Sequence, residues 1–180
     1  MDELEVLKIV VKKLKSAGIL YMVTGSIAAN FYTTPRMTRD IDIVIEVEKK
    51  DGEKLSSLFS DDFYLDKDSL KNAIHLKKIF NVIHNEALVK IDFIIRKDIG
   101  YRKIEFDRRR NIDFEGTHIA IVSPEDLILS KLYWAKESIS EMQLRDVKNL
   151  FMSIAGLDIA YIEKWVMELE LEQVYHEVKK

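Results

Sequence analysis

The sequence predicts an α/β fold in which a small mixed β-sheet is flanked by helices and followed by a mainly helical C-terminal portion. Residues 39–47 alternate between polar and apolar side chains for most of their length, which is typical of a strand with one buried face. Residues 4–14 place apolar side chains at helical spacing, with lysines between them. From Pro124 onward the chain has the pattern of successive helices.

The remaining elements follow in chain order. We expect a helix from residue 4 to near Gly18, a strand over 19–23, a helix over 27–31, helices over 53–59 and 69–76, strands over 79–83 and 87–95, and a short strand over 119–122. The short connection 84–86 predicts that the strands on either side form an antiparallel hairpin. Ser123 is a good N-cap for the helix that starts at Pro124.

Composition excludes several classes of function. The chain has 180 residues and a net charge of -3, which argues against broad, sequence-independent adhesion to DNA. It has no cysteine, so disulfides, thiolate zinc sites and a cysteine nucleophile are excluded. Charged side chains interrupt the first twenty residues, so we expect no signal peptide, no membrane span and a cytoplasmic location. A soft boundary near residues 97–100 would divide a core, 1–98, from a helical portion, 99–180, that packs on it.

Two aspartates on the strand over 39–47 are the first candidates for chemistry. Residues two apart on a strand point to the same face, so Asp40 and Asp42 would lie roughly 6 to 7 Å apart on one side. The isoleucines between and after them would enter the core and hold the pair rigidly. Two like charges repel unless a cation compensates them, and carboxylate oxygens favour Mg²⁺ or Mn²⁺.

A third aspartate and a glycine-serine turn extend this candidate site. Asp92 is the single acid in an otherwise apolar strand, where an unpaired carboxylate would be costly. If its strand lies beside the first, Asp40, Asp42 and Asp92 could hold two metal ions about 3.5 to 4 Å apart. Gly25 would let the backbone approach a phosphate, and Ser26 and the N-terminus of the following helix would supply donors.

Arginines close to the acidic pair are further candidates. Arg36 and Arg39 precede it in the chain, and they could clamp triphosphate oxygens or orient the strand through bonds to carboxylates.

These motifs resemble the DNA polymerase beta nucleotidyltransferase superfamily, and most closely its small prokaryotic members of the AbiEii type. The resemblance covers about residues 20–150 and rests on Gly25-Ser26, then Asp40-Ile41-Asp42, then Asp92. It implies that the Gly-Ser turn holds nucleotide phosphates and that the three aspartates bind the metals. The segments 108–132 and 144–150 are similar to those in which this group places a functional lysine and an Arg/Lys-Asp step. By that analogy, Lys131 and Asp146 would line the nucleotide site.

The function expected from these residues is metal-dependent transfer of a nucleoside monophosphate from a nucleoside triphosphate to an acceptor hydroxyl. Asp40, Asp42, Asp92 and Lys131 would be catalytic. The acceptor stays open among a small molecule, a protein side chain and an RNA end. An alternative is a non-catalytic binding module of the same fold, such as one half of a toxin–antitoxin pair whose protein partner is encoded nearby. A third alternative, a nucleotide-sugar glycosyltransferase, gives no role to the Gly-Ser turn or to Asp92.

Overall fold

The computed structural model describes residues 1–38, 40–138 and 140–179. These residues form two compact units. The first comprises Met1–Ile27 and Met37–Ile121, and the second comprises Ala28–Arg36 and the chain from Val122 onward. The boundary expected near residues 97–100 falls inside the first unit, and the division into domains at that point stays a prediction.

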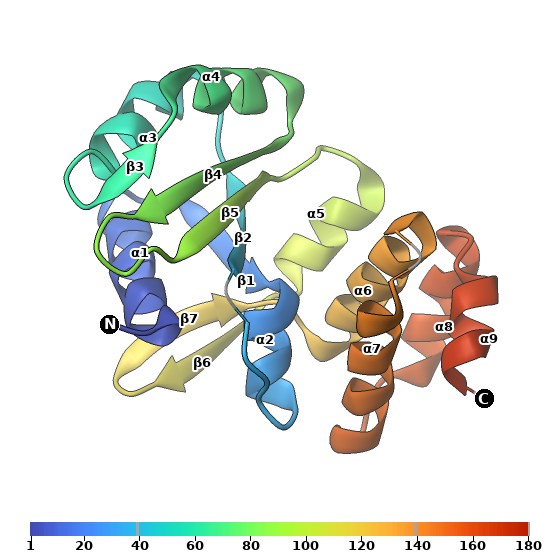
Figure 1. The fold of residues 1–180 in the computed structure, drawn as a ribbon. Coiled ribbons are helices and arrows are strands. Elements are labelled where there is room, and N and C mark those ends of the chain that lie inside the picture. Colours follow the sequence, from blue (N-terminus) through green and yellow to red (C-terminus); the bar gives the residue numbers. More distant parts are fainter. Residues whose placement is uncertain (39, 139, 180) are drawn as a thin grey trace. The chain divides into compact units, whose positions relative to one another are not determined.

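The first unit is built on a mixed sheet, as predicted. Within the described part of the chain, seven strands form this sheet in the order β3-β4-β5-β2-β1-β7-β6, with β2 in the middle (Figure 1). The strands are β1 Leu20–Thr24, β2 Asp40–Glu46, β3 Phe63–Leu65, β4 Ile79–His84, β5 Lys90–Ile95, β6 Arg110–Phe114 and β7 Thr117–Ile121.

Both parallel and antiparallel pairs occur in the sheet. β2 pairs antiparallel with β1 and parallel with β5, which confirms the expected adjacency of the two aspartate-bearing strands. β4 and β5 form the expected antiparallel hairpin. The two edge strands, β3 and β6, were not predicted, because β3 has only three residues and β6 is mostly polar.

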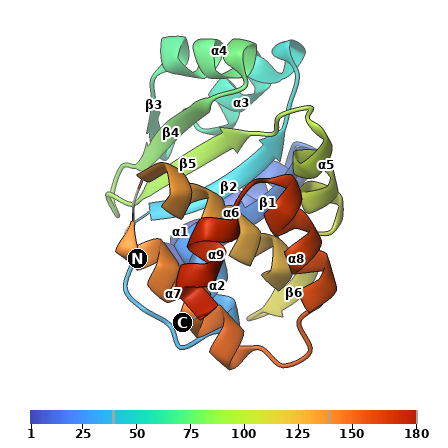
Figure 2. The same cartoon turned by 90° about the vertical axis from the view of Figure 1, so that its right-hand side faces the viewer.

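The core of this unit lies on one face of the sheet. Ile41, Ile43 and Ile45 of β2 are fully buried, and the residues that alternate with them are not. Helix α1, Glu3–Ser16, packs against β1 and β2. Helices α3, Gly52–Leu58, and α4, Lys67–Leu76, pack on each other beside β4 (Figure 2). The same alternation turns the aspartates of β2 and β5 toward the opposite face of the sheet.

Two further helical elements belong to the first unit. A short 3₁₀ helix, Lys49–Asp51, precedes α3, and α5, Gly100–Asp107, follows β5. The sequence offers both Asp66 and Asp68 as the N-cap of α4, and it is the carboxylate of Asp66 that accepts from the backbone N–H of Ser69.

The second unit is helical. Its elements are the larger part of α2, Gly25–Tyr32, and the helices α6 Pro124–Ser138, α7 Glu141–Ser153, α8 Ile159–Glu168 and α9 Glu172–Lys179. Helix α6 packs against α7, α8 and α9 (Figure 2). Ser123 caps α6 as predicted, because its Oγ accepts from the backbone N–H of Asp126 at 3.2 Å. None of the helices in the described ranges is long and apolar enough to cross a membrane.

Candidate active site

The strand register brings the predicted aspartates to one face of the sheet. Asp42 on β2 and Asp92 on β5 are direct partners in the parallel pair, and Asp40 is the partner of Lys90. Residues that face each other on adjacent strands share a face, and so do residues two apart on one strand. The three carboxylates therefore lie on the same side of two neighbouring strands, on an anchor of fully buried isoleucines.

A row of polar side chains crosses four strands at this level. Asp42 is paired with Thr24 of β1, and Asp92 is paired with Asn81 of β4. Thr24 is buried, whereas Asn81 is exposed and carries an amide that can both donate and accept hydrogen bonds. Sequence reasoning missed Asn81, because only the register of β4 against β5 places it beside Asp92.

Lys90 lies between two of the carboxylates. Its Nζ is 2.9 Å from Oδ2 of Asp92 and 3.6 Å from Oδ2 of Asp40. The hydrogen bond with Asp92 raises the pKa of the Lys90 ammonium, partial burial lowers it, and the negative charges of both aspartates add to the net rise. Lys90 is therefore charged at neutral pH. Sequence reasoning did not include Lys90 in the site. Its spacing could have indicated it, because Lys90 precedes Asp92 by two residues on the same strand and so shares its face.

Gly25 is in contact with the carboxylate of Asp42. Its φ of +67° lies in the left-handed region that favours glycine. A Cβ at this position would lie 1.9 Å from Oδ2 of Asp42 and 2.7 Å from its Cγ, so any side chain here would force the Asp42 carboxylate to move. The Asp42 carboxylate thus lies at the first residue of α2, where the helix dipole stabilises negative charge. Ser26 follows in the first turn of the same helix and is half-buried.

The chemistry of these residues fits a divalent cation. Three carboxylates supply the hard oxygen donors that Mg²⁺ and Mn²⁺ prefer, and an ammonium already lies between two of them. Within the described ranges, no three acidic, histidine or cysteine side chains converge closely enough to hold a metal ion as they stand. The structure therefore brings Asp40, Asp42 and Asp92 onto one face without forming a ready-made metal centre.

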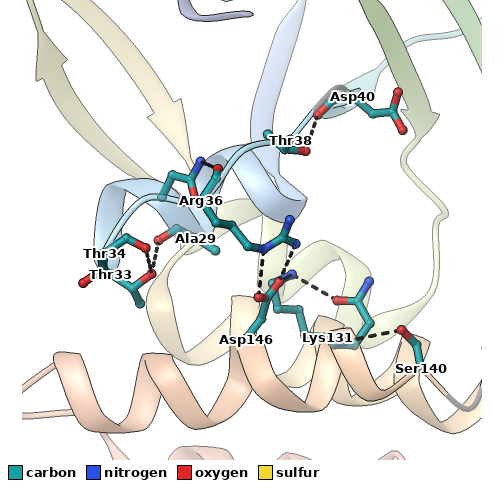
Figure 3. Close-up of polar contacts among 11 residues, drawn as sticks. Ala29, Thr33, Thr34, Arg36, Thr38, Asp40, Lys131, Ser140 and Asp146 are labelled. Carbon is teal, nitrogen blue, oxygen red and sulfur yellow. Dashed lines mark hydrogen bonds and ion pairs between the residues drawn. The ribbon is translucent and has the colours of Figure 1, made fainter.

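The second unit holds a separate cluster of charges around Asp146. Its carboxylate is 5% exposed and accepts from Arg36 through Nε at 3.1 Å and Nη2 at 2.9 Å (Figure 3). It also accepts from Lys131 Nζ at 2.8 Å, and Lys131 is itself only 3% exposed. Lys131 donates in addition to Oε1 of Gln143 at 3.0 Å, a partner that sequence reasoning missed.

The contacts of Asp146 indicate how it could act on a ligand. Its carboxylate lies between two cations, so it would affect ligand binding by holding the side chains of Arg36 and Lys131 in position. That these three residues bind a nucleotide stays a prediction. Arg39, which was also predicted to bind the nucleotide, lies outside the described residues.

The Asp146 cluster predicts a pH dependence of stability. Burial by itself would raise the pKa of the Asp146 carboxyl, but hydrogen bonds from Arg36 and Lys131 outweigh it and hold the pKa below its usual 3.8. A depressed pKa in the folded state means that the ionised carboxylate stabilises the fold above pH 3.8, and that this contribution is lost as the pH falls through the folded-state pKa. We expect Asp146→Asn to lower the free energy of unfolding by about 3 kcal/mol at pH 7, because two cations lose their buried partner.

Urea unfolding followed by tryptophan fluorescence measures this effect locally. Both tryptophans of the chain, Trp134 and Trp165, lie in helices of the second unit. The difference between wild type and Asp146→Asn should shrink when the pH is lowered from 7 to 3. Asp107→Asn, at an exposed position of the first unit, serves as the control and should show no such difference. A difference for Asp146→Asn that is equal at both pH values would contradict the assignment.

The mixed sheet flanked by helices has the nucleotidyltransferase fold, which this chain shares with solved structures. No protein-family model matches the sequence, and no relative is found among curated proteins.

Three solved structures illustrate the likeness. An antigenic nucleotidyltransferase-like protein from Paracoccidioides brasiliensis is 16% identical with a TM-score of 0.59, over 97% of this chain and 91% of that one. The antibiotic-resistance factor ANT(2'')-Ia is 12% identical with a TM-score of 0.60, over 100% of both chains. The lincosamide antibiotic adenylyltransferase LnuA, solved with lincomycin bound, is 15% identical with a TM-score of 0.57, over 86% of this chain and 99% of that one. At these identities the likeness shows the fold.

Proposed function

We propose that this protein is a metal-dependent nucleotidyltransferase that moves a nucleoside monophosphate from a nucleoside triphosphate to an acceptor hydroxyl. The observation that carries this proposal is the direct pairing of Asp42 with Asp92 on parallel central strands, with the Asp42 carboxylate against Gly25. The shared fold with nucleotidyltransferases supports it. Acidic residues on a sheet would mean little alone, but the register of β2 and β5 puts three of them on one face.

The reaction is a substitution at the α-phosphorus of the nucleotide. The acceptor oxygen forms a bond to that phosphorus while the bond to the bridging oxygen of the β-phosphate breaks, so pyrophosphate leaves. The hydroxyl proton passes to a carboxylate oxygen of Asp92. Magnesium or manganese, when bound, would polarise the phosphoryl oxygens and neutralise the charge that develops on them.

The chain's own residues supply position and charge. Asp40 and Asp42 would hold the cation that accompanies the triphosphate, and Asp92 would complete the site of a second cation and help to activate the acceptor hydroxyl. Gly25 and Ser26 would bring backbone and hydroxyl donors to the outer phosphates at the start of α2. The rigid isoleucine anchor behind the aspartates keeps these groups in place, and positioning of this kind contributes much of the rate gain in phosphoryl transfer.

A small molecule is the first acceptor class to test. Two of the structural neighbours are antibiotic-directed proteins by their own description, an antibiotic adenylyltransferase and an antibiotic-resistance factor. Lincosamides, the antibiotic class named for one of these neighbours, therefore belong in the first panel of acceptor hydroxyls. Kinship with the AbiEii-type group and a protein partner encoded nearby stay predictions.

One observation favours the second candidate, a module that binds nucleotide without transferring it. In the described part of the chain the carboxylates do not converge on a metal position, and Lys90 bonds to one of them. A binding module would retain affinity for nucleotide but show no turnover under any metal condition.

Incubation with α-labelled nucleoside triphosphates, Mg²⁺ or Mn²⁺ and a panel of acceptors tests the proposal. We expect label to appear on an acceptor together with one equivalent of pyrophosphate. Removal of the metal with excess EDTA is expected to abolish transfer, because the carboxylates and the triphosphate would then repel each other without compensation.

Re-addition of Mg²⁺ or Mn²⁺ after EDTA treatment should restore the rate, which controls for damage to the protein. Calorimetry with a non-hydrolysable triphosphate analogue measures binding in parallel. Binding without pyrophosphate release across nucleotides, metals and acceptor classes would favour the non-catalytic module. Transfer that continues at full rate in EDTA would contradict the metal-dependent mechanism.

A further inference from the structure

Charged side chains of both signs lie on the face that carries the three aspartates. Among the described residues, three carboxylates and the Lys90 ammonium lie there on two neighbouring strands. The first residue of α2 lies against Asp42, whereas Lys90 lies against the other two, Asp40 and Asp92. Each carboxylate of the candidate site thus has a source of positive potential supplied by the chain itself.

We propose that Lys90 is an internal counter-cation that competes with the divalent metal for Asp40 and Asp92. This inference rests on the proposed function, because it assumes that these carboxylates bind a metal. In the metal-free protein the ammonium holds the two strands' carboxylates together. When a metal binds, Lys90 has to leave Asp92.

Geometry supports a competition between the two cations. Lys90 Nζ is within hydrogen-bond distance of Oδ2 of Asp92, and a coordinated divalent ion would need oxygen atoms of the same carboxylate at about 2.0 to 2.1 Å. An ammonium that stayed beside Asp92 would also repel the ion. The absence of a ready-made metal cluster among the described residues follows naturally, because the carboxylates are arranged around an ammonium.

The lysine side chain is able to make this movement. Lys90 is 37% exposed, and its flexible four-carbon stem can carry the ammonium toward solvent without a change in the strand. Most half-exposed ion pairs have little consequence for stability. Lys90 differs from them because both of its partners are candidate ligands, so its charge bears directly on metal affinity.

Titration of Mn²⁺ into the full chain without nucleotide, followed by the electron paramagnetic resonance signal of the free ion, tests the inference. Lys90→Met should lower the Kd for Mn²⁺ by about 10-fold or more, because it removes the competing charge and keeps a similar stem. Lys90→Arg retains the charge and should bind with a Kd near that of wild type. Lys12→Met removes the same charge from an exposed position on α1 and should also bind like wild type.

The outcomes separate this inference from the proposed function. An equal or weaker affinity in Lys90→Met than in wild type, with Mn²⁺ binding present in both, overturns the role of Lys90 and leaves the metal site intact. No Mn²⁺ binding in any of the four proteins overturns the metal-dependent function and the inference with it.

A measurement on wild type covers the case in which Lys90→Met does not fold. Brief acetylation followed by mass spectrometry reports the reactivity of individual lysines. Addition of Mg²⁺ should raise the acetylation rate of Lys90 several-fold, because its ammonium leaves the carboxylates, and should leave that of Lys12 unchanged. An unchanged or lower rate at Lys90 with saturating Mg²⁺ would overturn the proposal.

Discussion

Asp42→Asn is expected to lower the rate of nucleotidyl transfer by about 10³-fold. Asp42 is the aspartate in contact with Gly25 and paired with Asp92, so it lies at the centre of the candidate site. An amide of the same shape removes the negative charge that would bind the cation while it leaves packing nearly unchanged. A loss of about 10³-fold corresponds to about 4 kcal/mol of transition-state stabilisation, which is in the range expected of one electrostatic group in a metal-assisted site.

The matched control is Asp107→Asn. Asp107 is an exposed residue at the end of α5, and its replacement changes net charge by the same amount. It should transfer at the wild-type rate. Circular dichroism of both variants checks that the fold is retained. Transfer by Asp42→Asn at more than a tenth of the wild-type rate would contradict the assignment of the site to this face.

Gly25→Ala is expected to lower the transfer rate by about 10²-fold or more. It is also expected to lower the stability of the first unit. The left-handed φ of +67° costs an alanine about 1 to 2 kcal/mol. The added methyl group would also overlap the Asp42 carboxylate, at 1.9 Å from Oδ2 and 2.9 Å from Cβ. Since a misplacement of about 1 Å in a catalytic group can cost 10²-fold, activity should fall even in molecules that still fold.

Gly18→Ala separates the effect of the left-handed φ from the effect of contact with Asp42. Gly18 has almost the same φ, +65°, but nothing lies within 4 Å of the position that its Cβ would take. We therefore expect Gly18→Ala to lower the free energy of unfolding in urea by about 1 kcal/mol and to leave the transfer rate unchanged. Gly25→Ala should be the less stable and the less active of the two. Equal effects on both stability and activity would mean that contact with Asp42 does not matter.

A double-mutant cycle checks the same contact. Asp42→Ala removes Oδ2 and Cγ, which are the two atoms closest to the added methyl group. The loss of stability caused by Gly25→Ala should therefore be smaller in the Asp42→Ala background. A purely additive result would point to backbone strain alone.

Much of the fold follows from local patterns in the sequence. The alternation over 39–47 identifies β2 and its buried isoleucines, because a strand has a period of two and one face of this one is covered. Ser123 and Asp66 mark the starts of α6 and α4, because their side chains accept hydrogen bonds from the first turns of those helices. The nucleotidyltransferase fold was expected from a resemblance carried by a few short motifs, and the solved structures agree with it.

The contacts that give the candidate site its properties could not be read from local patterns. Lys90 and Asn81 look like ordinary polar residues of strands until the register places them beside Asp40 and Asp92. Arg36 and Asp146 are far apart in the chain, and only folding of the second unit brings the guanidinium to the carboxylate. No periodicity encodes a partner at such a distance.

By itself, the sequence determined which residues of this protein are acidic, which face of each strand is apolar, and where a glycine permits a turn. These properties depend on side-chain chemistry and on the short repeats of helix and strand, so neighbouring residues are enough to reveal them. Only the tertiary structure decided that Asp42 pairs with Asp92, that Lys90 lies between two carboxylates, and that Gly25 makes room for a third. Those facts depend on strand order and register, which arise from the packing of segments distant in the chain.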